Sequence, residues 1–173
     1  EPRQSGVMND PLTPELVLRA GLAIARGAEF AFLITSGTGD APTVRLMQPF
    51  PPSDDFTVWL GTSPASRKAA ELRANPAATI AYQAPDGTGY VSVQGVASLV
   101  TDLEARAGHW REEWQAFFPG GPKGDDFVLV QLVAHRLEVA DFARGITPPP
   151  YGLKSAAIVR DGAGWRFQPY PDT

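Results

Sequence analysis

The sequence contains no cysteine, which excludes disulfide bonds, thiolate nucleophiles and cysteine-ligated metals. Only two histidines are present, His109 and His135, too few for a multi-histidine metal site. No apolar run approaches the roughly 18 residues that span a bilayer, and the start does not resemble a signal peptide. We therefore expect a cytoplasmic protein with no membrane segment and no resident metal.

An excess of positive charge is also missing. Fifteen Lys and Arg residues against nineteen Asp and Glu residues give a net charge of −4, which argues against nucleic acid or an anionic membrane as a partner. Any cationic cluster must therefore be local. With 173 residues, 43% of them hydrophobic, the chain is long enough for one soluble domain with a sizeable core. We expect a flexible leader over residues 1–12 and a single domain over residues 13–173.

Short apolar runs separated by tight turns dominate the chain, with few helical patterns between them. Such a succession favours an antiparallel β-barrel with helices packed outside it, rather than alternating βαβ units. Gly95 lies inside a strand pattern, which predicts a bulge or a close backbone approach. The predicted strands are 30–35, 42–48, 56–60, 77–83, 90–101, 127–142 as one strand or as two broken near His135, 156–160 and 165–168.

Three helices are expected. One begins at the Thr13-Pro14 cap and ends at Gly27. Another runs from Asp102 to Phe117, because its apolar residues recur in steps of three and four. Trp110 and Trp114 lie on that stripe, and they serve either core packing or a ligand or dimer surface.

The remaining helix belongs to residues 56–75, the stretch around which the chain is organised. Ser63 suits the N-cap and Pro64 the first helical position. Arg67 and Lys68 follow in the first turn, at the unfavourable end of the helix dipole for a cation. One interpretation is a solvated face, and the other is an anion site that uses the free N–H groups and the cations together.

Arg45 lies in the middle of an apolar strand, and a buried charge there needs a partner. Alternation places Arg45 and Met47 on one face of the strand and Leu46 on the other. The partner is either a nearby carboxylate or an anion shared with the helix start at Ser66.

Taken together, four segments resemble the pyridoxamine 5'-phosphate oxidase-like family of FMN-binding split barrels, most closely its general-stress-protein branch. They are Arg45-Leu46-Met47-Gln48, Trp59-Leu60-Gly61-Thr62 with Ser66-Arg67-Lys68, Tyr90-Val91-Ser92-Val93-Gln94-Gly95, and Phe118-Pro119-Gly120-Gly121 before Asp125-Asp126.

The resemblance implies a split antiparallel β-barrel that forms a homodimer, with a flavin site at each subunit interface. FMN is the usual ligand, and FAD or a deazaflavin are alternatives. By position, Arg45, Ser66, Arg67 and Lys68 would hold the ribityl phosphate, with Gly61 and Thr62 beside them. Leu46 and Met47 would run along the flavin ring. No catalytic residue is implied.

Two departures from the family pattern bear on activity. The Arg-x-His segment of the pyridoxamine phosphate oxidases is replaced here by Trp165-Arg166-Phe167-Gln168. Oxidation of pyridoxamine phosphate is therefore not expected. The tryptophan that stress-branch relatives carry near the end of the long strand is also missing, and Phe142 is the candidate to replace it. A low-specificity flavin oxidoreductase, a flavin carrier or sensor, a haem protein using His109 or His135, and a barrel that binds nothing remain alternatives.

Overall fold

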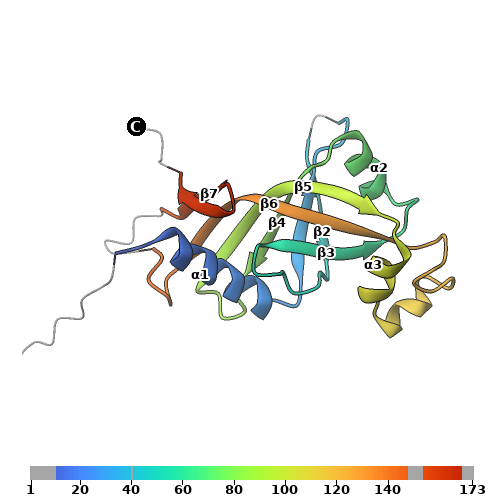
Figure 1. Cartoon of the computed structure of the whole chain (residues 1–173), viewed down its shortest axis with the longest axis horizontal. Helices are drawn as coiled ribbons and strands as arrows, with labels where there is room; N and C mark the ends of the chain where they lie inside the picture. Colours follow the sequence, from blue (N-terminus) through green and yellow to red (C-terminus); the bar gives the residue numbers. More distant parts are fainter. Residues whose placement is uncertain (1–10, 40, 148–153, 169–173) are drawn as a thin grey trace, which may run out of the picture.

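The computed structural model describes residues 11–39, 41–147 and 154–168. Most of the predicted leader, Asp40 in the first hairpin turn, and residues 148–152 of the connection before the last hairpin lie outside these ranges. The described part is mainly antiparallel β-sheet with few helices (Figure 1), which confirms the predicted split antiparallel barrel. The strands are β1 (Ala31–Thr35), β2 (Thr43–Met47), β3 (Thr57–Thr62), β4 (Ala77–Gln83), β5 (Gly89–Val100), β6 (Val128–Asp141), β7 (Ala156–Asp161) and β8 (Gly164–Phe167).

The long strand β6 organises the sheet. The strands follow the order β2-β1-β4-β5-β6-β7-β8, with β3 paired to β6 outside this path. Strand β5 pairs along nearly the whole of β6, whereas β3 pairs with residues 128–133 and β7 with residues 136–139. Because β5 occupies one edge of β6, β3 and β7 share the other edge, and the sheet divides between them. Strands β1/β2, β4/β5 and β7/β8 pair as antiparallel hairpins, in agreement with the tight turns predicted between successive apolar runs.

The predicted irregularity at Gly95 is a β-bulge. Gln94 pairs with Arg136 and Gly95 pairs with Ala134, so His135 is the extra residue of β6. A Cβ at Gly95 would lie 2.3 Å from the Val133 carbonyl oxygen, which explains the glycine. The interruption near His135 is therefore a bulge within one continuous strand, not a break into two.

Helix α1 (Pro14–Gly27) begins as predicted, because the Thr13 side chain accepts a hydrogen bond from the Leu16 N–H. It buries Val17 and Ile24 in the main core, and it packs against strands that include β5 and β6. The other two helices are α2 (Arg67–Ala74) and α3 (Leu103–Gly108). Among the described helices, none has both the length and the apolar character needed to cross a bilayer.

The prediction of a single helix over residues 102–117 is wrong. Helix α3 ends at Gly108, and after a short extended segment the chain forms the 3₁₀ helix η1 (Glu112–Ala116). The break lets the His109 ring stack on Trp59 with centroids 4.4 Å apart. Both tryptophans of the predicted stripe still reach an aromatic cluster, where Trp110 and Trp114 lie 5.1 and 5.7 Å from the Phe127 ring.

Candidate functional site

The start of α2 differs from its prediction by one turn. Ser66 is the N-cap, with its Oγ accepting a hydrogen bond from the Ala69 N–H, and Arg67 is the first helical residue. Residues 63–66 instead form a turn in which the Ser66 N–H donates to the Ser63 carbonyl. The assignment of Ser63 and Pro64 to the cap was therefore wrong. With Ser66 as the N-cap, Lys68 is the second helical residue and lies in the first turn, where N–H groups have no partner within the helix.

Most of the predicted site residues line one hollow of about 350 Å³ beside this helix start. Met47 comes from the end of β2, Gly61 and Thr62 from β3, and Ser66 and Lys68 from the α2 start. The hollow exists because the β3 strand leads directly into the turn before α2, while β2 ends nearby.

Hydroxyl groups and one ammonium group form the polar end of this hollow. Lys68 Nζ donates to Thr62 Oγ1 at 3.1 Å, and that oxygen lies 3.2 Å from Ser66 Oγ. Burial lowers the pKa of Lys68 from its usual value, and the nearby Arg45 and Arg67 lower it further, against an opposing effect of Glu71. The Lys68 ammonium thus lies in a place with more positive than negative charge, where an anionic ligand would be stabilised.

Arg45 has the carboxylate partner that was one of its two predicted alternatives. Its Nη2 donates to Glu71 Oε2 at 2.6 Å and its Nη1 to Thr35 Oγ1 at 2.5 Å. The side chains of Arg45 and Glu71 are each only 14% exposed. Glu71 also accepts hydrogen bonds from Thr35 and Thr43, and its pKa falls to about 2, chiefly through the Thr35 bond and then through Arg45.

Arg67 lies apart from the hollow. Its side chain is 74% exposed and its Nε is 3.6 Å from Glu71 Oε1. Arg45 and Arg67 therefore meet at Glu71, while Lys68 and the hydroxyls meet in the hollow, and Lys68 is close enough to both arginines to respond to their charge.

The side chain of Leu46 is 57% exposed and projects from the opposite face of β2 to Met47, as the alternation predicted. Gly61 is explained by packing, because a Cβ there would lie 2.5 Å from an atom of the Trp114 ring.

Replacing Gly61 with alanine is expected to destabilise the protein by about 2 kcal/mol, since the Trp114 ring would have to move within a packed aromatic cluster. Urea unfolding monitored by tryptophan fluorescence measures this. Gly108→Ala is the matched control, because nothing lies within 4 Å of a Cβ at that position. Equal stability of the two variants would contradict the packing explanation.

Sequence reasoning missed the wall of the hollow. Trp114, Phe117 and Phe118 line it from η1 and the residues that follow, and Gln48 lines it from beyond β2. Trp114 lies on the predicted apolar stripe that could serve a ligand, and Phe117 is the last residue of the helix predicted there, so the stripe was the available signal. Glu71 was also missed, although it lies four residues after Arg67 on one helix.

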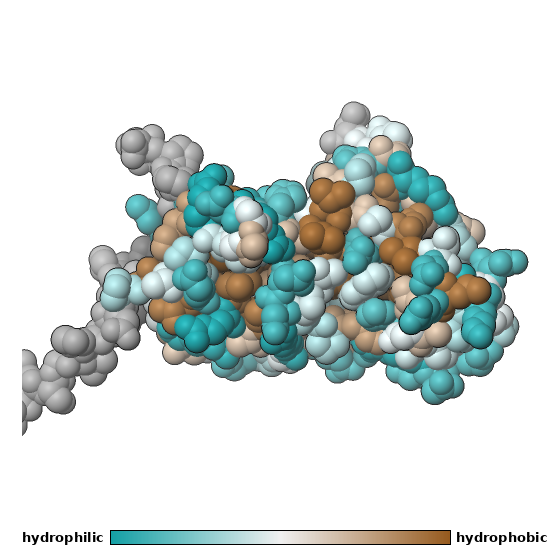
Figure 2. Space-filling model, viewed as in Figure 1, coloured by the Kyte–Doolittle hydropathy of each residue, from teal (hydrophilic) through white to brown (hydrophobic). Residues whose placement is uncertain are grey.

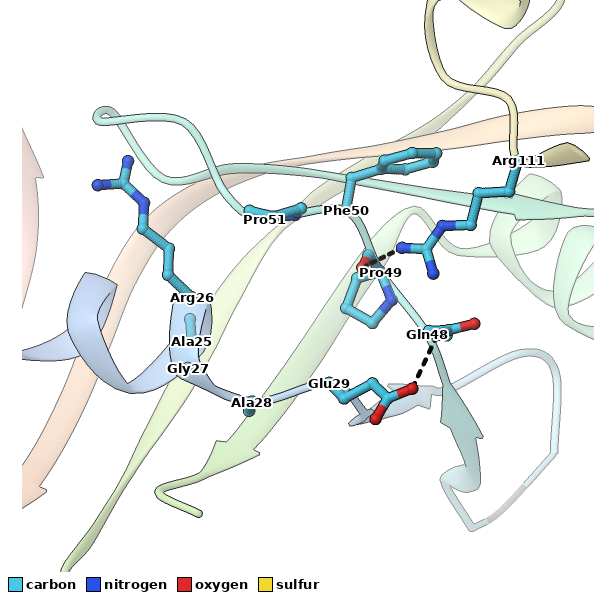
Figure 3. A pocket seen from close by; sticks show the side chains of 10 residues that line it. All are labelled: Ala25, Arg26, Gly27, Ala28, Glu29, Gln48, Pro49, Phe50, Pro51 and Arg111. Atoms are coloured by element: carbon cyan, nitrogen blue, oxygen red, sulfur yellow. Dashed lines mark hydrogen bonds between the residues drawn. The ribbon is translucent and has the colours of Figure 1, made fainter. Parts of the chain in front are cut away.

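A second hollow, of about 280 Å³, lies between the end of α1, residues 48–51 and Arg111 (Figure 3). Its polar side chains have partners within the protein. Gln48 Nε2 lies 3.2 Å from Glu29 Oε1, Arg111 donates to the Pro49 carbonyl, and Arg26 donates to the Pro52 carbonyl and to Asp54. These contacts fasten the β2–β3 connection to α1 and to η1, and they account for the polar groups without a ligand.

A third hollow, of about 500 Å³, lies at the other end of the sheet. Exposed aromatic side chains from β1, from β5 and from just after β6 surround a floor of small residues. These residues include Phe32, Tyr90, Phe142, Ala81, Ala140 and Gly89.

Comparison with known proteins gives one family. Residues 22–157 match the family described as "Pyridoxamine 5'-phosphate oxidase like". No curated protein matches the sequence.

Similar solved structures agree with this family in fold. General stress protein 26 from Bacillus anthracis is 20% identical, with a TM-score of 0.63 over 72% of this chain and 93% of that one. A Clostridium acetobutylicum protein related to general stress protein 26 is 15% identical, with a TM-score of 0.70 over 86% and 98%. A pyridoxamine 5'-phosphate oxidase-related, FMN-binding protein from Nostoc punctiforme is 15% identical, with a TM-score of 0.58 over 90% and 94%.

Proposed function

The chain belongs to the pyridoxamine 5'-phosphate oxidase-like family, and we propose that it binds FMN in the hollow between β2, β3 and the start of α2. The observation that carries the proposal is the convergence of Lys68, Ser66 and Thr62 at one end of that hollow. The similar Nostoc punctiforme protein is described as FMN-binding, which supports the choice of ligand.

The local charges fit a phosphate monoester. Three cations, Arg45, Arg67 and Lys68, lie around one carboxylate, that of Glu71. The pKa of Lys68 is lowered first by burial and then by the charges of Arg45 and Arg67. A phosphate with nearly two negative charges would relieve this imbalance. Lys68 and Ser66 would contact it directly, the first-turn N–H groups would donate to it, and Arg45 and Arg67 would add their charge from around Glu71.

The ring system would extend from the phosphate along Leu46 and Met47, with the Trp114 side of the hollow opposite. When bound, FMN supplies hydride or electron transfer at its ring, so the protein needs to bind, orient and shield it rather than to provide a nucleophile. Within the hollow, Lys68 is the titratable side chain, and we assign it to phosphate binding. A catalytic residue is therefore not assigned.

A homodimer belongs to the proposal, with the flavin site at the subunit interface. Support comes from apolar side chains on the outer face of the β1/β2 hairpin, where Phe32, Val44 and Leu46 are each more than half exposed. Figure 2 shows apolar side chains beside the hollowed middle of the molecule. Burying such a face against a second copy would remove it from water, and the aromatic hollow at Phe32 and Phe142 would then lie in or near the interface.

A low-specificity flavin oxidoreductase is the function we propose, in a cytoplasmic location, with a non-catalytic flavin carrier or sensor as the second candidate. The absence of a second acid or base beside Lys68 in the hollow is compatible with both. A haem role gains no support from the described residues. His109 is packed on Trp59 with its Nδ1 3.0 Å from the Ala105 carbonyl oxygen, and His135 is exposed at the bulge.

The purified protein is expected to bind FMN with a stoichiometry of one per chain and to elute as a dimer. A visible spectrum, FMN fluorescence titration, and size-exclusion chromatography with light scattering measure this on one sample. Unchanged fluorescence and mobility of added FMN would overturn the proposal. Anaerobic addition of NADH or NADPH to the loaded protein then separates the two candidates, because bleaching of the flavin spectrum indicates an oxidoreductase and its absence a carrier or sensor.

A further inference from the structure

Phe117 is the most exposed large apolar residue in the described chain, with 75% of its surface accessible. Its backbone position is well defined. The N–H groups of Phe117 and Phe118 both donate to the Trp114 carbonyl, at 2.9 and 2.8 Å. The exposure of this ring is therefore a consequence of how η1 ends.

The neighbours of Phe117 have a different environment. Trp114 and Phe118 pack against each other and against Phe127 in the aromatic cluster, with centroid distances between 5.1 and 6.3 Å. Phe117 is absent from this cluster, although it lines the same hollow as Trp114 and Phe118. Its ring is thus left to the hollow and to solvent.

The hollow therefore combines two kinds of surface. Lys68, Ser66 and Thr62 provide a cationic, hydroxyl-bearing end, whereas Phe117 and Trp114 provide aromatic surface a short way from it. A single exposed phenylalanine is ordinary on a protein surface. One that shares a pocket with an uncompensated ammonium group matches a ligand that has both a phosphate and a planar ring.

We propose that Phe117 is a ligand-contacting residue whose ring covers the planar ring of the phosphate-bearing ligand held at Lys68. This inference rests on the proposed function and adds to it a division of the site. Lys68 and the hydroxyls recognise the phosphate, and the end of η1 recognises the ring. Aromatic contact of this kind contributes to affinity through burial of both faces and through ring stacking.

The test compares riboflavin, which has the ring but no phosphate, with FMN. Dissociation constants of both are measured by flavin fluorescence titration for the wild type, Phe117→Ala and Lys68→Met. Phe117→Ala is expected to raise the dissociation constants of riboflavin and FMN by the same factor, about 5- to 20-fold. Lys68→Met is expected to weaken FMN binding and to leave the riboflavin dissociation constant within about twofold of the wild-type value.

The matched control is Phe167→Ala, which removes an exposed phenylalanine from β8. Strand β8 reaches β6 only through β7, which pairs with residues 136–139, whereas Gly61 and Thr62 of the hollow pair with residues 129 and 128. It is expected to change neither dissociation constant. Phe117→Tyr keeps the ring and is expected to restore binding to within about threefold of the wild type. Thermal unfolding of each variant verifies folding, and the exposed position of Phe117 predicts an unchanged midpoint.

Two results would overturn the inference while the proposed function stands: Phe117→Ala leaves both dissociation constants unchanged, or it weakens FMN alone. A wild-type protein that binds neither flavin would instead overturn the proposed function, and the inference with it. A fall in both affinities with Phe117→Ala, with no rescue by Phe117→Tyr, also contradicts ring contact.

Discussion

Replacing Lys68 with methionine is expected to weaken FMN binding by about 30- to 100-fold without lowering the stability of the apoprotein. A charge-assisted hydrogen bond to phosphate contributes about 2 to 3 kcal/mol to affinity. In the apoprotein, Lys68 is partly buried among other cations, which lowers its pKa and makes its charge unfavourable. Its best neutral partner is the Thr62 hydroxyl. Methionine keeps most of the length of the side chain and removes the unfavourable charge.

Fluorescence titration with FMN and urea unfolding of the apoprotein measure the two effects separately. Lys123→Met, at an exposed lysine in the loop before β6, is the control for loss of one positive charge. The control is expected to leave the FMN dissociation constant within about twofold of the wild-type value. If Lys68→Met destabilised the apoprotein while its FMN affinity stayed at the wild-type value, Lys68 would be a structural residue and the phosphate assignment would be wrong.

The Glu71→Gln variant is expected to lose about 3 kcal/mol of unfolding free energy at pH 7. It removes the counter-charge of Arg45, whose side chain is only 14% exposed. Breaking one partner of a buried pair costs about 3 to 5 kcal/mol, and partial exposure places this pair at the lower end. Glutamine keeps the shape of the side chain and one hydrogen-bond acceptor. The loss of unfolding free energy is therefore due to the missing charge and not to a cavity.

The effect of Glu71→Gln is also expected to depend on pH. In the folded protein the Glu71 pKa is about 2, below the usual 4.5, because Thr35, Arg45 and Thr43 donate to its charged form. A carboxyl with a lowered pKa stabilises the folded state above the unfolded-state pKa, and this contribution is lost as the pH falls through the folded-state pKa. The difference in unfolding free energy between the wild type and Glu71→Gln should therefore be largest above about pH 4.5 and decrease toward pH 2.

Urea unfolding at several pH values between 2 and 7 measures this profile. Glu104→Gln, at an exposed carboxylate in α3, is the control and is expected to change stability by less than about 0.5 kcal/mol. A constant difference across the whole pH range would show that Glu71 acts through packing and not through its charge.

Several residues that line the hollow could be grouped from the sequence because they are close together in the chain. Ser66, Arg67 and Lys68 are consecutive, and the alternation of β2 separates Leu46 from Met47 whatever the rest of the fold does. The bulge at Gly95 was predictable for the same reason, since a glycine inside a strand pattern has few other uses. The hairpins followed from turn residues between short apolar runs.

The η1 region could not be predicted in this way. The apolar spacing from Leu103 to Phe117 matches a continuous helix, yet the chain breaks after Gly108. The break is decided by contacts with distant residues, among them the His109 ring on Trp59 and the Arg111 hydrogen bond to the Pro49 carbonyl. Periodicity describes one segment alone, and it contains no information on such partners.

By itself, the sequence determined the strands, the tight turns between them, and the grouping of Ser66, Arg67 and Lys68 near a helix start, which it placed one turn too early. Only the tertiary structure decided which cation is available to a ligand. It brings Glu71 of α2 against Arg45 of β2 and leaves Lys68 with a neutral partner. The physical reason is that a charge is neutralised by whatever lies within a few ångströms, and neighbours at that distance are set by the packing of α2 on the β1/β2 hairpin.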